Sequence, residues 1–126
     1  EGSTWEALMS GATFGCDNLV ALFDCNGVQA DGAVHVQLEP VLEKIAAFGW
    51  SAIEIDGNDM QALVEALEAS RARDGRPKAI IMRTQPGRGI STLEKRERAH
   101  FVRIPDEEWQ AMRDELEAGR PGGNHG

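Results

Sequence analysis

Short apolar runs alternate with helix-like segments along this chain, and this alternation most constrains its fold. The runs that read as strands are 19–24, 51–55 and 78–83. Strands that alternate with helices of about ten residues usually form a mainly parallel sheet, because each connection must cross over the sheet. The sequence therefore predicts an α/β fold, with a mainly parallel sheet flanked by helices.

Apolar residues at helical spacing predict the helices. The predicted helices are Thr4 to about Gly15, Pro40 to Phe48, Asp59 to about Arg73 and Asp106 to about Ala118. The buried face of the third helix is expected to consist of Met60, Leu63, Val64 and Leu67. The segment 33–38 fits either a loop or a short strand.

Composition limits both the number of domains and the class of partner. A chain of 126 residues predicts one domain, here 1–118, followed by a disordered tail, 119–126. The formal net charge of -8 argues against a nucleic-acid surface, which needs basic residues. No run is long enough to span a bilayer, so no membrane contact is predicted. Cys16 and Cys25 match neither a CxxC motif nor the cysteine spacing of secreted proteins, so we interpret them as reduced thiols and predict a cytoplasmic location.

A polar loop with glycines follows the first strand-like run. Asn26 offers a neutral carbonyl oxygen, Gly27 permits a positive φ, and Val28 then presents its main-chain carbonyl. Mg²⁺ accepts such oxygens together with substrate phosphates, so the loop could hold a magnesium diphosphate. Asn-Gly is also a common hairpin signal, and a plain turn is the other interpretation.

The order of motifs along the chain resembles the diphosphate-binding domain of transketolases, and is most similar to the N-terminal subunit of split, two-gene transketolases. The motifs that carry the resemblance are Glu1-Gly2, Trp5-Glu6-Ala7, Asp24-Cys25-Asn26-Gly27-Val28-Gln29, Phe48-Gly49-Trp50, Asp56-Gly57-Asn58-Asp59, Arg83-Thr84, Gly87-Arg88-Gly89 and Ala99-His100. It covers nearly all of the chain except the tail. The resemblance implies the C-terminal part of the diphosphate-binding domain, with the thiamine-diphosphate-binding fold.

In this family thiamine diphosphate is held through Mg²⁺. The resemblance implies that Asn26 and Val28 are two of the metal ligands, with Gly27 between them at the cofactor. The third family ligand, the aspartate of a Gly-Asp-Gly motif, does not occur in this sequence and is expected a few positions before Glu1. Without this carboxylate, tight binding of the cofactor by this piece alone is not expected.

The resemblance also implies three catalytic residues. His100 matches a histidine that lies over the cofactor diphosphate and reaches toward the substrate, so it is both a catalytic and a cofactor-binding candidate. Glu1 and Glu6 match acidic residues that join the two active sites of a dimer by proton transfer. Without the family context, these side chains would be interpreted as an exposed loop histidine, a frayed terminus and a solvated helix residue.

Four positions depart from the usual family pattern. Asn58 stands where a histidine is common, and Arg83 where a lysine is common. Ala99 and Phe101 replace a tryptophan and a glycine beside His100. The last two changes alter the wall of the substrate channel, which puts the ordinary sugar-phosphate substrate in doubt.

The resemblance implies a transketolase-like transferase that moves a two-carbon unit from a small-molecule ketose donor to an aldehyde acceptor. The chain would be active only with a partner subunit that carries the pyrimidine-binding domain, in a dimer of heterodimers. One alternative is a subunit of a 2-oxo acid decarboxylating or acyl-transferring thiamine enzyme. A second alternative is a non-catalytic α/β assembly module.

Overall fold

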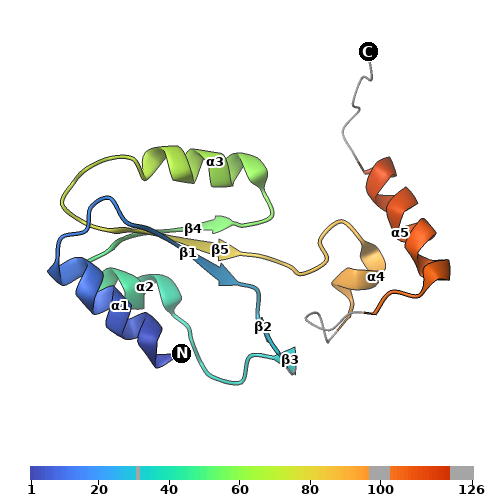
Figure 1. Cartoon of the computed structure of the whole chain (residues 1–126), viewed down its shortest axis with the longest axis horizontal. Coiled ribbons are helices and arrows are strands. Elements are labelled where there is room, and N and C mark those ends of the chain that lie inside the picture. Colours follow the sequence, from blue (N-terminus) through green and yellow to red (C-terminus); the bar gives the residue numbers. More distant parts are fainter. Residues whose placement is uncertain (31, 97–102, 120–126) are drawn as a thin grey trace, which may run out of the picture. The chain divides into compact units, whose positions relative to one another are not determined.

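The computed structural model describes residues 1–30, 32–96 and 103–119, and it divides the chain into two compact units (Figure 1). The first unit consists of Glu1–Asn26 and Val36–Thr84. The second consists of Gly27–His35 and Gln85–Gly126. The first unit contains the parallel sheet and the principal hydrophobic core.

The sheet has three parallel strands, β1 (Val20–Cys25), β4 (Ser51–Asp56) and β5 (Lys78–Arg83), in the order β1-β5-β4. The central strand is the most apolar: Ala79, Ile80 and Ile81 are at most 1% exposed. Burial on both faces is typical of a parallel strand covered by helices on both sides. The predicted α/β class with a parallel sheet is confirmed.

The register of the sheet aligns the carboxyl ends of its strands. Cys25 of β1 and Asp56 of β4 are both paired with Arg83 of β5. The residues that follow these strands, Asn26, Thr84 and Gly57, therefore leave the sheet at one edge. This edge is where α/β proteins usually bind ligands.

Two helices, α1 (Gly2–Thr13) and α2 (Val41–Ala47), lie on one face of the sheet (Figure 1). Leu8 and Ile45 from these helices pack with Ile81 and Trp50 in the core. The indole Nε1 of Trp50 donates a hydrogen bond of 2.8 Å to the main-chain oxygen of Leu8. This bond satisfies a buried polar group and joins α1 to the start of β4.

Helix α3 (Met60–Ala69) covers the opposite face, and its predicted buried side was wrong (Figure 1). Ala66 is the buried residue, at 5% exposure, whereas Met60 is 71% and Val64 48% exposed. The helix approaches the sheet through the small side chain of Ala66, while Leu63 is half-buried and Leu67 is 39% exposed. It also ends at Ala69, before the predicted end near Arg73.

The second unit contains a short antiparallel pair, β2 (Val28–Gln29) and β3 (Gly32–Ala33), and the helices α4 (Ser91–Glu94) and α5 (Asp106–Ala118). In the segment 33–38, which the sequence left open, only Ala33 belongs to a strand. Met112 of α5 is buried at 3% exposure, while Trp109 is 52% exposed. The apolar spacing over 106–118 therefore predicted this helix correctly.

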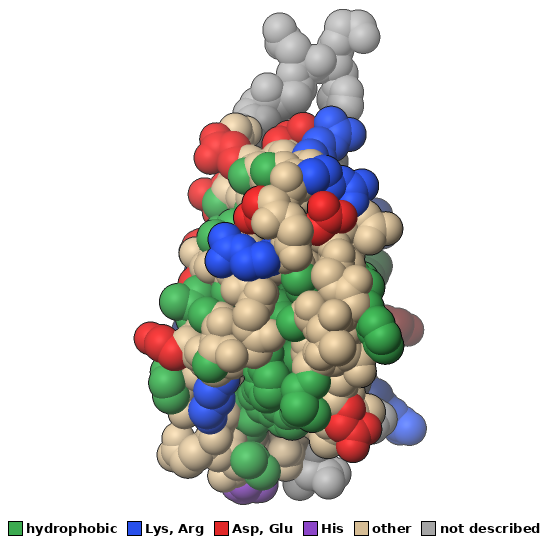
Figure 2. Space-filling view, turned by 90° about the vertical axis from the view of Figure 1, so that its left-hand side faces the viewer, with side chains coloured by type: hydrophobic (Ala, Val, Ile, Leu, Met, Phe, Trp, Pro, Cys, Tyr) green, Lys and Arg blue, Asp and Glu red, His purple; other side chains and the backbone are tan. Residues whose placement is uncertain are grey.

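Several large apolar side chains remain at the surface, and Figure 2 shows hydrophobic side chains gathered on one face among charged ones. Across the molecule this exposed set includes Met9, Phe14, Leu22, Met60 and Val64. Among the described residues, no helix has both the length and the apolar character needed to cross a bilayer.

Candidate functional site

Three side chains form a hydrogen-bonded bridge between the carboxyl ends of β1 and β5. The hydroxyl of Thr84 donates to Oδ1 of Asp24, and the amide Nδ2 of Asn26 donates to Oδ2 of Asp24 at 2.9 Å. We call Thr84, Asp24 and Asn26 the strand-end bridge. Asp24 is exposed, whereas Thr84 and Asn26 are half-buried, so the bridge lies at the surface of the sheet edge.

Gly57, which follows β4, packs against the carboxyl end of β5. A Cβ at this position would lie 2.5 Å from Cγ2 of Thr84 and 2.6 Å from Cβ of Met82, which is closer than side-chain atoms can approach. The main-chain N–H of Gly57 also donates to the carbonyl of Arg83 at 2.9 Å. Glycine is needed here because the loop after β4 packs directly on the end of β5.

Arg83 ties together two carboxylates at the same edge. Its Nη2 donates to Oε2 of Glu39 at 3.0 Å and to Oε2 of Glu54 at 2.7 Å, and its Nη1 donates to Oε1 of Glu39. The hydrogen bonds from Arg83 lower the pKa of Glu39 to about 2, and those to Glu39 and Glu54 raise the pKa of Arg83. The cluster holds the start of α2 against β4 and β5.

The loop after β1 has the backbone that Asn-Gly predicts. Gly27 has a φ of +72°, in the left-handed region, and its carbonyl accepts a 3.0 Å hydrogen bond from the N–H of Val34. Val28 is the first residue of β2. Cys25, at the end of β1, is half-buried, and burial raises the pKa of its thiol, which keeps it protonated at neutral pH.

Of the remaining predicted site residues, two lie at the start of α1 or within it, and one lies outside the described residues. Glu1 and Glu6 are both exposed, at the start of α1 and within it. His100 lies outside the described residues, as do its neighbours Ala99 and Phe101. The roles of Glu1, Glu6 and His100 therefore stay predictions.

The sequence interpretation did not assign a role to Asp24, Thr84 or Gly57, although all three occur in the quoted motifs. A usable signal was present, because each lies at or just beyond the end of a predicted strand. What was missing was the strand order, which places Thr84 next to a residue 60 positions earlier in the chain.

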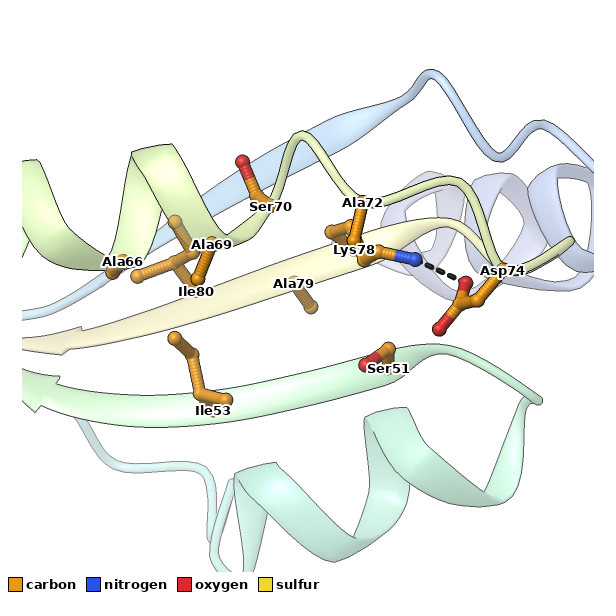
Figure 3. A pocket seen from close by; sticks show the side chains of 10 residues that line it. All are labelled: Ser51, Ile53, Ala66, Ala69, Ser70, Ala72, Asp74, Lys78, Ala79 and Ile80. Carbon is orange, nitrogen blue, oxygen red and sulfur yellow. Dashed lines mark hydrogen bonds and ion pairs between the residues drawn. The ribbon is translucent and has the colours of Figure 1, made fainter.

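A cavity at the amino end of the strands provides a contrast (Figure 3). It lies between α3 and the sheet, with Ala66 and Ala69 over Ile80. Its volume of about 160 Å³ is below the roughly 300–1,000 Å³ typical of small-molecule pockets. Lys78, 6% exposed, contacts the Asp74 carboxylate there and donates to the Arg76 carbonyl at 2.8 Å. The cavity is therefore a minor gap beside a satisfied lysine.

The family model described as "Transketolase, thiamine diphosphate binding domain" matches residues 1–120. The chain belongs to this family. Transketolase family protein y4mO of Sinorhizobium fredii, an uncharacterized protein, is 43% identical over 94% of the chain. The 6-deoxy-6-sulfo-D-fructose transketolase subunit SqwG of a Clostridium species is 36% identical over 93% of it.

Solved transketolases share the fold of this transketolase-family chain. The enzyme from Campylobacter jejuni aligns at a TM-score of 0.66 and 23% identity. The alignment covers 94% of this chain and 22% of the Campylobacter chain. A Pichia stipitis transketolase aligns with a TM-score of 0.65 and 19% identity over 94% of this chain and 21% of its own. The chain spans 44% of y4mO and 43% of SqwG, so it corresponds to part of those relatives.

The donor atoms at the strand ends fit a magnesium diphosphate in part. Within residues 1–30, 32–96 and 103–119, no group of three or more His, Cys, Asp or Glu side chains could hold a metal. The candidate donors are instead neutral oxygens, the amide oxygen of Asn26 and the carbonyl of Val28. Mg²⁺ commonly combines such ligands with waters, phosphate oxygens and one or two carboxylates, so these neutral oxygens fit such a site as part of its ligand set.

Proposed function

We propose that this chain holds the magnesium-diphosphate end of thiamine diphosphate in a transketolase-like enzyme. The observation that carries the proposal is the position of Asn26. It follows β1 at the carboxyl edge of a parallel sheet, in a domain of the thiamine diphosphate binding family, and its amide is anchored by Asp24. A hard cation bound to the diphosphate would take the amide oxygen as a neutral ligand.

In this proposal each residue of the chain has a limited task. Asn26 and Val28 supply oxygen ligands to the metal, and Gly27, whose φ is positive, separates them in the sequence. When bound, thiamine diphosphate supplies the nucleophilic carbon that allows a carbon–carbon bond beside a carbonyl to be broken and remade. His100 donates hydrogen bonds near the diphosphate and moves protons at the substrate oxygens.

The complete enzyme transfers a two-carbon ketol unit from a ketose-type donor to an aldehyde acceptor. A partner that carries the pyrimidine-binding domain completes the active site, and Glu1 and Glu6 relay protons between the two sites of the assembly. The name of the Clostridium relative supports this proposal, because that protein is a transketolase subunit acting on 6-deoxy-6-sulfo-D-fructose. It also favours ketol transfer over 2-oxo acid chemistry.

The test is a calorimetric titration of Mg²⁺ and thiamine diphosphate into the natural assembly that contains this chain. We expect Asn26→Ala to weaken binding at least tenfold, through the loss of one metal ligand. Asn18→Ala is the matched control, since Asn18 is an exposed asparagine that precedes β1 rather than follows it, and it should stay within twofold.

Each other outcome points to a different function. Equal binding by the parent and Asn26→Ala would remove Asn26 from the site. No binding at all by the parent assembly would leave the assembly module as the remaining interpretation. Turnover of 2-oxo acids but not of sugar phosphates by the loaded assembly would contradict ketol transfer while keeping the cofactor site.

A further inference from the structure

We propose that Asp24 and Thr84 are positioning residues that fix the direction of the Asn26 amide toward the metal. This inference rests on the proposed function, since it concerns the ligand atom that Asn26 offers. It goes beyond that function by assigning a task to two side chains that do not bind the metal themselves. The evidence is the strand-end bridge, in which one carboxylate accepts from both neighbours.

An asparagine side chain has two chemically different ends. Its oxygen is a metal ligand, whereas its NH₂ group donates hydrogen bonds and repels a cation. Asp24, as a carboxylate, only accepts hydrogen bonds, so the contact of 2.9 Å selects the NH₂ end of Asn26. The oxygen is then held at the other end of the amide. Without Asp24, rotation by half a turn would present the wrong group to the metal.

Asp24 is itself held from the neighbouring strand. Thr84 donates its hydroxyl to the second carboxylate oxygen, and Gly57 packs against the methyl group of Thr84. These contacts restrict the side chains of an exposed sheet edge before any ligand arrives. Ligands oriented by such partners commonly bind metals 10–100-fold more tightly than unsupported ones.

A purely structural task for the bridge is less consistent with its position. Strands β1 and β5 are already aligned over six residue pairs, from Val20 with Lys78 to Cys25 with Arg83. One more hydrogen bond at an exposed end adds little to a sheet of that length. Its greater effect is on the residue that follows β1, which is Asn26.

The experiment uses two substitutions at Thr84 that separate its two contacts. Thr84→Val keeps the methyl group beside Gly57 and removes the hydroxyl, whereas Thr84→Ser keeps the hydroxyl and removes the methyl group. We expect Thr84→Val to weaken Mg²⁺-dependent thiamine diphosphate binding by about fivefold or more, and Thr84→Ser to stay near the parent. The melting temperatures of the same assemblies should follow the opposite order from their affinities, with Thr84→Ser less stable than Thr84→Val.

Asp24→Ala should weaken the same binding by about tenfold or more, seen also as a higher Mg²⁺ concentration for half-saturation. Its control is Asp56→Ala, which removes another carboxylate from the end of a neighbouring strand, where it accepts from the N–H of Asn58. Asp56→Ala should leave the affinity within twofold. Neither readout requires turnover by the loaded enzyme.

The outcomes separate this inference from the proposed function. If Asn26→Ala weakens binding but Asp24→Ala and Thr84→Val do not, the positioning role is wrong and the cofactor site stands. Binding that follows thermal stability across all variants, with Thr84→Ser as impaired as Thr84→Val, would reduce the bridge to a structural contact. If Asn26→Ala has no effect, both proposals fail.

Discussion

The polar side chains at the two ends of the parallel sheet find their hydrogen-bond partners in different ways. At the amino end, the side chain of Lys78 is buried and its ammonium contacts both Asp74 and the Arg76 carbonyl, so its partners lie within residues 74–78. At the carboxyl end, Asp24 accepts hydrogen bonds from Asn26, which follows β1, and from Thr84, which follows β5.

This difference indicates what each end does. A buried charge that finds its partners locally completes the fold and offers little to a ligand. The network at the carboxyl end joins separate strand ends where α/β proteins usually bind ligands. It therefore fixes the direction of the Asn26 amide, which can contact a ligand. Substitutions at the amino end should therefore change stability alone, and those at the carboxyl end should change cofactor binding as well.

The largest effect is expected for Gly57→Ala. The new Cβ would overlap Cγ2 of Thr84 and Cβ of Met82, so we expect a loss of about 2–3 kcal/mol in the free energy of unfolding and weaker cofactor binding. Denaturant unfolding and calorimetry measure the two effects. Gly75→Ala, at the amino end, is the control: its φ of +78° costs about 1 kcal/mol, but affinity should not change. Equal losses of affinity would abolish the contrast between the ends.

A somewhat smaller effect is expected for Lys78→Ala, which removes a buried stem and its ion pair. Denaturant unfolding should show a loss of about 2 kcal/mol. Lys78→Met should recover most of that loss, because the methionine side chain fills the same space and the exposed side of Asp74 can be hydrated. Cofactor affinity should be unchanged in both variants, and a tenfold change in either would show that the two ends are coupled.

The smallest effect is expected in acid. The hydrogen bond from Lys78 lowers the pKa of Asp74 from 3.8 to about 2, so the folded protein holds this proton less tightly than the unfolded chain. The resulting stabilisation is complete above about pH 4 and is lost as the pH falls toward 2. The difference in melting temperature between the parent and Asp74→Asn should therefore shrink across this range. A constant difference from pH 6 to pH 2 would contradict the ion pair.

Glu39→Gln supplies the matching measurement at the carboxyl end. Arg83 lowers the pKa of Glu39 from 4.5 to about 2, so its contribution also disappears on acidification, beginning near pH 4.5. Since Glu39 is exposed, the effect on melting temperature should be slight.

Much of the fold could be predicted from local pattern. The apolar run 78–83 predicted strand β5, and Asn26-Gly27 predicted a turn with positive φ, since both signals depend on neighbouring residues. The buried side of α3 could not be predicted in this way. Met60 is exposed although its spacing predicted burial, because the helix approaches the sheet through Ala66, and only the position of the sheet decides which side faces it.

The sequence by itself determined the order of the elements, the glycine turn after β1 and the family to which the chain belongs, because each is encoded in residues close together in the chain. Only the tertiary structure decided that β5 lies between β1 and β4, and hence that Thr84 and Gly57 meet beside Asp24. The physical reason is that strand order and register arise from burial of the whole sheet. No short segment encodes which distant strand end will become its neighbour.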